Sequence, residues 1–457
     1  MSKLLQPPLM TQNTSPAAHR TAFLVTALCW VIVLFDGYDL IVYGTVLPEL
    51  FEEPGWGLTK STAGLLGSLA FLGMLVGAVL AGTLADRLGR RRTILGCTIW
   101  FSVFTALCAF APSPEVFGVL RFLAGLGLGG LVPSANALAT EFVGPRHRAV
   151  VSTLMMSGVP IGGTAAALVG IGVMPRFGWR TMFLIALLAV LVVIPLCLKL
   201  LPESPLWLRS RGEHTRAAEI EQRFGLPPGA DHDLVPQAER RLRSLLRPPY
   251  TNATLLFSLA TAVTLFAWYG LATWLPQLMR ESGFDLGSSL SFLLALSLGA
   301  VLGSLVTAWG GTRIGSIPTA VIAALAAAIG LATLLTHPHS AVAYGALVLA
   351  GVGTHGTQCL IIAAVANHYP AHLRGSALGF SLGFGRIGAV LAPQAGGWLL
   401  AAGLGVNSNF LAFALAAAVA GVLLLLCPRP TRSTTAHDAG SALDDNGNVP
   451  AYEKRAV

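Results

Sequence analysis

Two carboxylates, Asp36 and Asp39, lie three residues apart inside an apolar segment near the N-terminus. This segment is long enough to cross a bilayer. A charged side chain at the centre of such a helix costs roughly 2.5–3.5 kcal/mol on insertion scales. Residues three apart share one helix face, so we expect both acids to look into a protein interior or a water-filled cavity. Acids placed in this way can bind and release protons or hold a cationic partner.

Two arginines also fall inside apolar segments. At about 1.5 Å per residue, Arg121 lies nearly level with Asp36, so an ion pair with Asp36 or with Asp39 is allowed. The alternative is that Arg121 extends outward to the membrane surface. Arg386 lies about 18 Å past Arg374, too deep to reach water easily. A guanidinium matches a carboxylate, so a substrate carboxylate is its simplest partner; a permanent partner on a neighbouring helix is the alternative.

Polar and aromatic side chains at similar depth are candidates for the rest of a binding site. Tyr38 lies between the two acids, and Trp268 and Tyr269 offer ring faces in the seventh apolar segment. The alternative for these two rings is the aromatic belt at the membrane surface. His355 and Gln358 are three residues apart in the tenth segment. A buried His that only satisfies core hydrogen bonds is the alternative for His355.

A charged turn joins the second and third apolar segments. Asp86, Arg87 and Arg90 lie close together in a turn that also contains Gly82 and Gly89. They predict ion pairs between helices that stabilise one state of a bundle that moves during function. A plain basic cytoplasmic loop is the alternative. Glu141 and Arg148 lie on either side of the next basic loop, and we expect Glu141 to pair with the Arg-rich loops rather than with substrate.

The composition fits a polytopic membrane protein. Of the 457 residues, 54% are hydrophobic and only 11% are charged, with a mean hydropathy of +0.69. A soluble domain carries about 25% charged residues. The six cysteines lie in apolar segments without metal or disulfide spacing. Residues 1–20 lack a signal-peptide pattern, so the first apolar segment is expected to stay in the protein.

Twelve apolar segments of spanning length predict an all-α integral membrane protein with two six-helix bundles related by pseudo-two-fold symmetry. We expect domains at 21–201 and 250–427, a cytoplasmic linker at 202–249, and cytoplasmic tails at 1–20 and 428–457. The predicted segments are 21–48, 61–85, 93–111, 115–141, 148–174, 179–201, 250–279, 287–310, 315–336, 341–367, 374–400 and 406–427.

Basic residues fix the expected orientation. With both termini in the cytoplasm, most Lys and Arg residues lie in inner loops and tails, as the positive-inside rule requires. The net charge of +8 is therefore a topology signal and does not indicate nucleic acid. The outer loops then hold four basic residues, namely Lys60, Arg176, Arg180 and Arg280.

The two halves of the chain repeat one another. The string Leu47-Pro48-Glu49-Leu50 is echoed by Leu275-Pro276-Gln277-Leu278, and the glycines of 125–130 are echoed at 351–356. Parallel six-helix repeats are one known transporter plan, with substrate bound between the halves at mid-depth.

Residues 21–427 resemble the major facilitator superfamily. The turn at 82–92 matches its signature between helices 2 and 3, and 202–208 resembles its Pro-Glu-Ser-Pro element. The string Asp36-Gly37-Tyr38-Asp39-Leu40 resembles the aromatic acid:proton symporter family, whose bacterial members import benzoate, hydroxybenzoates, gentisate and related acids. Sialate and shikimate-type symporters share parts of the pattern.

The resemblance implies roles for several residues. Asp36, Asp39 and Asp86 match acids that this family requires for transport, and Arg121 matches an arginine that the superfamily's helix-4 motif links to proton coupling. The second-half turn 311–315 lacks the equivalent Asp, so that loop departs from the pattern.

These observations predict a proton-driven importer of an aromatic carboxylate in the bacterial inner membrane. We expect no enzyme activity, no cofactor, no metal and no nucleic-acid partner. Protons, a small aromatic acid and membrane lipid are the expected partners of a monomer. A sugar porter or a proton-coupled drug exporter is the alternative, although Arg386 argues against an exporter of cations.

Overall fold

The computed structural model describes residues 16–144, 147–224, 226 and 244–428. In these ranges the regular structure is helical, and twelve helices are long and apolar enough to cross a membrane. The prediction of an all-α protein with twelve spans is confirmed. The expected tails at 1–20 and 428–457 fall almost entirely outside the described residues.

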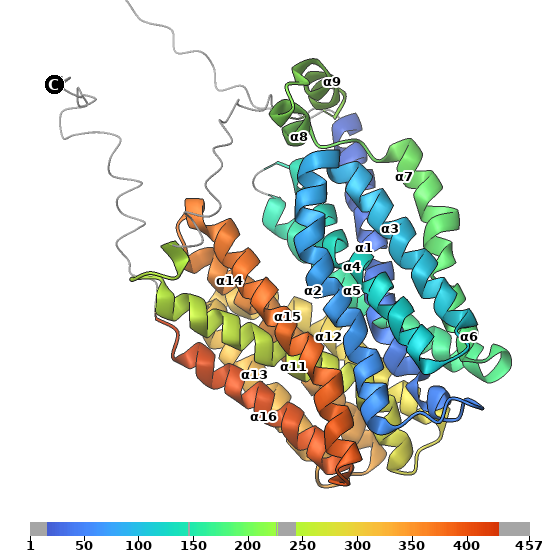
Figure 1. The fold of residues 1–457 in the computed structure, drawn as a ribbon. Helices are drawn as coiled ribbons and strands as arrows, with labels where there is room; N and C mark the ends of the chain where they lie inside the picture. Colours follow the sequence, from blue (N-terminus) through green and yellow to red (C-terminus); the bar gives the residue numbers. More distant parts are fainter. Residues whose placement is uncertain (1–15, 145–146, 225, 227–243, 429–457) are drawn as a thin grey trace, which may run out of the picture.

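The first six spans form one bundle, and the last six form a second bundle beside it (Figure 1). The first bundle contains α1 (Pro16–Phe51), α2 (Lys60–Leu88), α3 (Arg90–Leu107) with η1 (Cys108–Phe110), α4 (Pro114–Glu141), α5 (Arg148–Phe177), and the sixth span α6 (Trp179–Leu184), η2 (Ala189–Val193) and α7 (Ile194–Leu200). The second contains α11 (Thr251–Glu281), α12 (Leu286–Ile314), α13 (Ser316–Leu334), α14 (Ser340–His368), α15 (Ala371–Ala401) and α16 (Gly405–Leu425).

Local sequence signals explain where several helices begin. Thr59, Ser113 and Asp285 cap α2, α4 and α12, each accepting a hydrogen bond from a backbone N–H in the first turn. The sixth span differs from the single helix expected at 179–201. It is interrupted just after α6. Further along, a π-helical turn at Ala189–Val193 precedes Pro195, which has no N–H to continue the helical ladder.

The two bundles use equivalent contacts. A Cβ on Gly125 of α4 would lie 2.2 Å from the Ala70 carbonyl oxygen of α2, and one on Gly351 of α14 would lie 2.1 Å from that of Leu296 in α12. These glycines occupy matching repeat positions, and they let the helix backbones approach closely. The repeat seen in the sequence is therefore also a repeat in packing.

The short helices α8 (Pro205–Ser210) and α9 (His214–Phe224) lie at one end of the first bundle (Figure 1). We call this the α8–α9 end, and we call the other the opposite end. The ring of Phe224 on α9 contacts that of Phe142, with centroids 5.1 Å apart. The linker segment is thus attached to the first bundle in the part that the structure describes.

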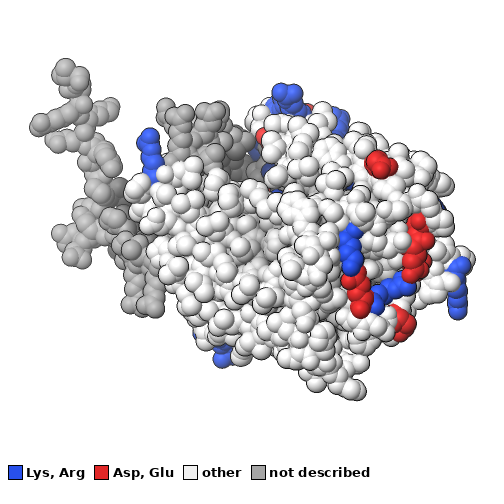
Figure 2. All heavy atoms as spheres, turned by 60° about the horizontal axis from the view of Figure 1, so that its bottom comes forward, with Lys and Arg blue, Asp and Glu red and all other residues white. Residues whose placement is uncertain are grey.

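The bundles are packed together at the opposite end. A Cβ on Gly44 of α1 would lie 2.2 Å from the carbonyl oxygen of Ala272 on α11, and one on Gly64 of α2 would lie 2.7 Å from that of Pro393 on α15. Two ion pairs cross between the bundles here, Arg280–Glu52 at 2.5 Å and Lys60–Glu281 at 2.9 Å. Figure 2 shows acidic and basic side chains gathered together on this face.

The same helix faces lack contacts at the α8–α9 end. Gly375, Gly379 and Gly383 lie on the α15 face that also carries Arg386, and a Cβ on any of these glycines would meet no atom within 4 Å. A Cβ on Gly82 of α2 would also meet no atom within 4 Å. The interface between α2 and α15 is therefore closed at the opposite end and separated at the α8–α9 end.

Candidate functional site

Asp39 and Arg121 form a fully buried ion pair inside the first bundle. The guanidinium of Arg121 donates to Asp39 Oδ2 at 2.9 Å and to the Asp39 backbone carbonyl at 3.3 Å. Asp39 Oδ1 accepts from the hydroxyl of Thr105 at 2.6 Å. Of the two pairings that the sequence allows, the structure thus contains the one with Asp39. This pair joins α1, α3 and α4.

Asp36 is buried without such a partner. Its side chain is 1% exposed, and its Oδ1 has no hydrogen bond. The charges that act on it are those of Arg386 on α15 and of Asp39 on its own helix. Asp36 therefore faces the second bundle across the interface, whereas Asp39 is paired with Arg121 inside the first bundle.

Arg386 reaches toward the first bundle from α15. Its guanidinium approaches the sulfur of Met74 on α2 at 3.7 Å, and it interacts with the hydroxyl of Tyr269 on α11. Among the described residues, no carboxylate lies in ion-pair contact with it. A partly buried guanidinium at this depth, without a permanent carboxylate, is ready to receive an anion.

The predicted aromatic residues of α11 lie in the protein interior, not in a surface belt. The ring of Tyr269 lies 4.6 Å from that of Phe71 on α2, so it bridges the bundles beside Arg386. Trp268, which is 3% exposed, lies 5.7 Å from the ring of His355 on α14. Gln358 follows one helical turn later. Five of the six predicted substrate-binding residues thus lie at or close to the interface.

The hydroxyl of Tyr38, the sixth of these residues, lies inside the first bundle. It donates to the carbonyl of Met182 on α6 at 2.9 Å. A residue two positions from Asp36 lies about 200° around the helix, so it cannot share the face of Asp36. The polar end of Tyr38 is occupied by a structural contact, and we leave it out of the site.

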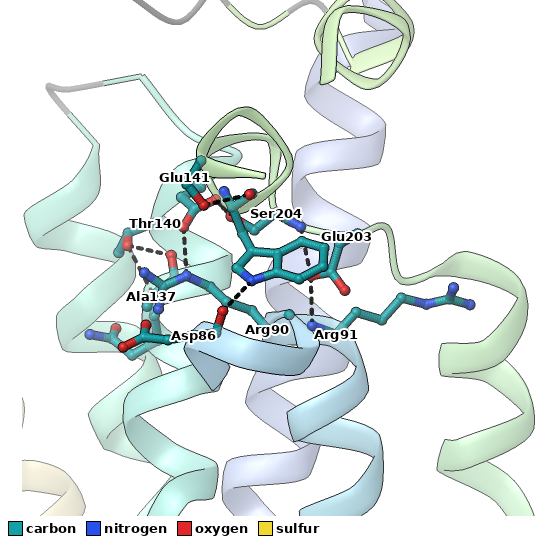
Figure 3. A network of polar contacts seen from close by, with 12 residues as sticks. Asp86, Arg90, Arg91, Ala137, Thr140, Glu141, Glu203 and Ser204 are labelled. Atoms are coloured by element: carbon teal, nitrogen blue, oxygen red, sulfur yellow. Dashed lines mark hydrogen bonds and ion pairs between the residues drawn. The ribbon is translucent and has the colours of Figure 1, made fainter. Parts of the chain in front are cut away.

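The charged turn between α2 and α3 belongs to a network at the α8–α9 end (Figure 3). Arg90 forms an ion pair with Glu141 at 3.0 Å, and Glu141 also accepts a hydrogen bond from Ser204. Arg148 acts on Glu141 electrostatically. The network joins α3, α4 and the start of α8, all of them within or against the first bundle.

The side chains of Asp86 and Arg87 are exposed, and neither makes an ion pair with another described residue. Their backbone carbonyls are used instead. The indole of Trp207 donates to the Asp86 carbonyl at 2.9 Å, and Arg211 donates to that of Arg87 at 2.9 Å. Among the described residues Asp86 makes no inter-helix ion pair, and α2 and α15 are separated at this end.

The sequence analysis missed Glu203 and the ion pairs at the opposite end. Glu203 accepts the backbone N–H of Arg91 at 2.9 Å and lies against Gly89, whose φ of 96° favours glycine. A signal for the pair Glu52–Arg280 exists in the sequence. The two residues occupy equivalent positions just after the repeated Leu-Pro strings, and equivalent residues near a two-fold axis face each other.

In the part of the chain that the structure describes, no group of three His, Cys, Asp or Glu side chains is placed to hold a metal ion. The chemistry of the site therefore comes from two buried acids, two arginines and the polar side chains of α11 and α14.

Comparison with known proteins agrees with this geometry. The Major Facilitator Superfamily model matches residues 29–393 and again 294–450. The gentisate transporter of Corynebacterium glutamicum is 51% identical over 411 residues, which cover 89% of this chain and 88% of the relative. The benzoate transport protein of Acinetobacter baylyi is 35% identical over 415 residues, covering 88% of each chain.

Among solved structures, the xylose transporter XylE from E. coli in an inward open conformation matches with a TM-score of 0.71. It covers 90% of this chain and 98% of XylE at 16% identity, so the likeness concerns the fold alone. The chain belongs to the major facilitator superfamily and, within it, to the aromatic acid transporter family. It is a multi-pass membrane protein.

Proposed function

We propose that this protein is a secondary active transporter that imports an aromatic carboxylate together with protons. The observation that carries the proposal is the placement of Arg386, which lies mid-membrane at the bundle interface without a carboxylate in contact among the described residues. A buried charge is retained in a membrane interior when it serves a ligand or an ion path.

The surroundings of Arg386 favour a flat, aromatic anion. The rings of Tyr269 and Phe71 close one side of the interface, and Trp268 lies next along α11. The names of the relatives, gentisate and benzoate transporters, point to the same class of substrate. Of the alternatives, a sialate or shikimate-like acid also carries a carboxylate, whereas a sugar or a cationic drug offers Arg386 no negative charge to pair with.

Coupling to protons follows from the charge of the substrate. Importing an anion into an inside-negative cell works against about 2.3 kcal/mol per charge per 100 mV. One proton cancels this cost, and a second lets the membrane potential drive uptake. A buried carboxylate without a cation in contact is less costly when protonated, so Asp36 is our proton site.

Asp36 and the substrate share one cation. When a substrate carboxylate engages Arg386, less of the positive charge remains to stabilise an ionised Asp36, so binding favours proton uptake at that residue. The loaded site is then close to neutral, and the two bundles can rock around it. Asp39 and Arg121 hold α1 against α4 and would transmit the change within the first bundle.

We place both termini and the α8–α9 end in the cytoplasm of a bacterial inner membrane, in line with the positive-inside rule. The structure then represents a state open toward the cytoplasm, because α2 and α15 are separated there. The network of Arg90, Glu141 and Arg148 would brace the first bundle in this state, and the exposed Asp86 and Arg87 would contact the second bundle when this end closes.

The decisive test is uptake into proteoliposomes of a panel of labelled acids, with the pH gradient and the membrane potential imposed separately. We expect benzoates to accumulate when the outside is acidic and to fail to accumulate without a gradient. Accumulation of a sugar or a non-aromatic acid, with benzoates ignored, would reject the proposal. An empty-liposome control corrects for passive entry of protonated acids.

A further inference from the structure

Two polar atoms on α14 are buried without hydrogen-bond partners. They are Nε2 of His355 and Oε1 of Gln358. His355 is 9% exposed, and its ring lies beside that of Trp268. A buried polar atom left without a partner costs about 1–3 kcal/mol, so two such atoms one helical turn apart point to a group that the pair receives.

The neighbouring polar residues of the same helix do not share this property. The hydroxyl of Thr354 donates to the carbonyl of Ala350, and that of Thr357 donates to the carbonyl of Ala320 on α13. The threonines are therefore satisfied within the bundle. His355 contacts Trp268 of α11, and Gln358 lies one helical turn further along the same face of α14.

The pair lies at the same depth as the charged groups of the site. Counted at 1.5 Å per residue from the α8–α9 end of each span, Asp36, His355 and Arg386 all lie about 20 Å in. A chain of contacts connects them around the interface, since Arg386 interacts with Tyr269 and the adjacent Trp268 contacts His355. The pair and Arg386 therefore approach the same space from two sides of α11.

We propose that His355 and Gln358 form a subsite for a hydroxyl group on the aromatic ring, at the edge away from the carboxylate that Arg386 holds. This inference rests on the proposed function. A hydroxyl can donate its one proton to Gln358 Oε1 and accept a hydrogen bond from His355 Nε2–H, so it satisfies both atoms when the His355 ring carries its proton on Nε2. The subsite selects ring-hydroxylated acids over unsubstituted or alkyl-substituted ones.

The affinity difference between hydroxylated and unsubstituted benzoates can be estimated. A site built to hydrogen-bond a hydroxyl discriminates against an analogue lacking it, because the polar groups of the site then stay buried and unpaired. We expect at least about tenfold tighter apparent affinity for a hydroxylated benzoate than for benzoate itself. The ring position at which a hydroxyl raises the affinity most, relative to benzoate, identifies the position that lies beside His355 and Gln358.

The experiment measures competition in proteoliposomes by benzoate and by 2-, 3- and 4-hydroxybenzoate and dihydroxybenzoates, for the wild type and three variants. In His355→Leu and Gln358→Met we expect the preference for the hydroxylated acid to collapse to within a few-fold, because the hydroxylated acid loses its hydrogen bonds and benzoate no longer leaves buried polar atoms unpaired. His355→Gln retains hydrogen-bonding groups and should recover part of the preference. Thr357→Val is the matched control on the same helix, and its preference should equal that of the wild type.

Each other outcome has a meaning. If the wild type carries none of these acids, the proposed function fails. If it carries benzoate and hydroxybenzoates and the variants leave their affinity ratio unchanged, the subsite is wrong and the proposed function stands. Should His355→Leu fail to yield a monodisperse protein, Gln358→Met and ligand binding measured by tryptophan fluorescence in detergent decide the question.

Discussion

At the scale of single residues, the two acids of α1 have different surroundings, so substituting them should affect transport and stability differently. Asp36 has an unpartnered oxygen facing the second bundle, so Asp36→Asn removes a titratable group without breaking a contact. We expect normal expression, loss of uphill accumulation driven by the pH gradient, and retention of substrate exchange between preloaded and external pools. Counterflow and gradient-driven uptake, measured side by side, check this.

Asp39→Asn should act on stability as well as on transport. It removes the charge that compensates buried Arg121, and breaking one side of a buried ion pair costs about 3–5 kcal/mol. We expect a lower thermal midpoint in detergent and loss of both counterflow and accumulation. A variant that keeps its wild-type midpoint would show that the pair is not structural.

Arg386→Ala should raise the apparent KM for the aromatic acid by at least about a hundredfold, because a charge-assisted hydrogen bond in a buried site is lost. Arg386→Lys keeps the charge but not the planar fork, so it should recover only part of the affinity. Substrate binding to the purified protein is the measurement. A wild-type affinity in Arg386→Ala would remove this residue from the site.

The sequence allowed an ion pair of Arg121 with either acid of α1 and did not decide between them. Asp36 and Asp39 are three apart on one helix face at similar depth, and the choice between them depends on how α1 is rotated against α3 and α4. The contact of Tyr38 with Met182 was not predictable for the same reason, since it depends on the tertiary position of α6.

At the scale of helices, the ion pairs at the opposite end join α1 to α11 and α2 to α11. Their side chains are partly exposed, so each pair contributes about 0–1 kcal/mol. That is enough to change the ratio of two nearly balanced states severalfold. In Arg280→Glu, like charges face each other beside Glu52, and we expect the opposite end to open more often.

Distances between spin labels placed at the outer ends of α1 and α11 would measure that opening. The double variant with Glu52→Arg and Arg280→Glu restores the attraction and should return the distribution to that of the wild type. If Arg280→Glu leaves the distances unchanged, these pairs do not hold the end closed.

Helix positions were largely predictable because spanning length and hydropathy are properties of a local segment. The exception, the interrupted sixth span, arose from a π-helical turn that hydropathy does not register. The two ion pairs between the bundles, Arg280–Glu52 and Lys60–Glu281, were not found from the sequence, because which loop ends meet depends on the relative position of the bundles.

At the scale of the whole molecule, α1 and α11 cross where Gly44 lies against the carbonyl of Ala272, at equivalent positions of the two repeats. Gly44→Ala would insert a methyl group 2.2 Å from that oxygen, and overpacking of this kind costs about 1–3 kcal/mol. We expect the variant to favour separation at the opposite end and to slow uptake severalfold. Gly172→Ala in α5, where a Cβ meets nothing within 4 Å, is the matched control for helix propensity.

The two ends of the molecule meet different media in the proposed orientation. The opposite end is joined partly by exposed ion pairs on the outside of the cell, whereas the charges of Asp86 and Arg87 lie at the α8–α9 end, on the cytoplasmic side. Salt added outside the cell therefore screens the ion pairs of the opposite end, since the Debye length falls from about 30 Å at 0.01 M to about 3 Å at 1 M salt. The balance between inward-facing and outward-facing forms should therefore shift in one direction only as the medium outside the cell becomes saltier.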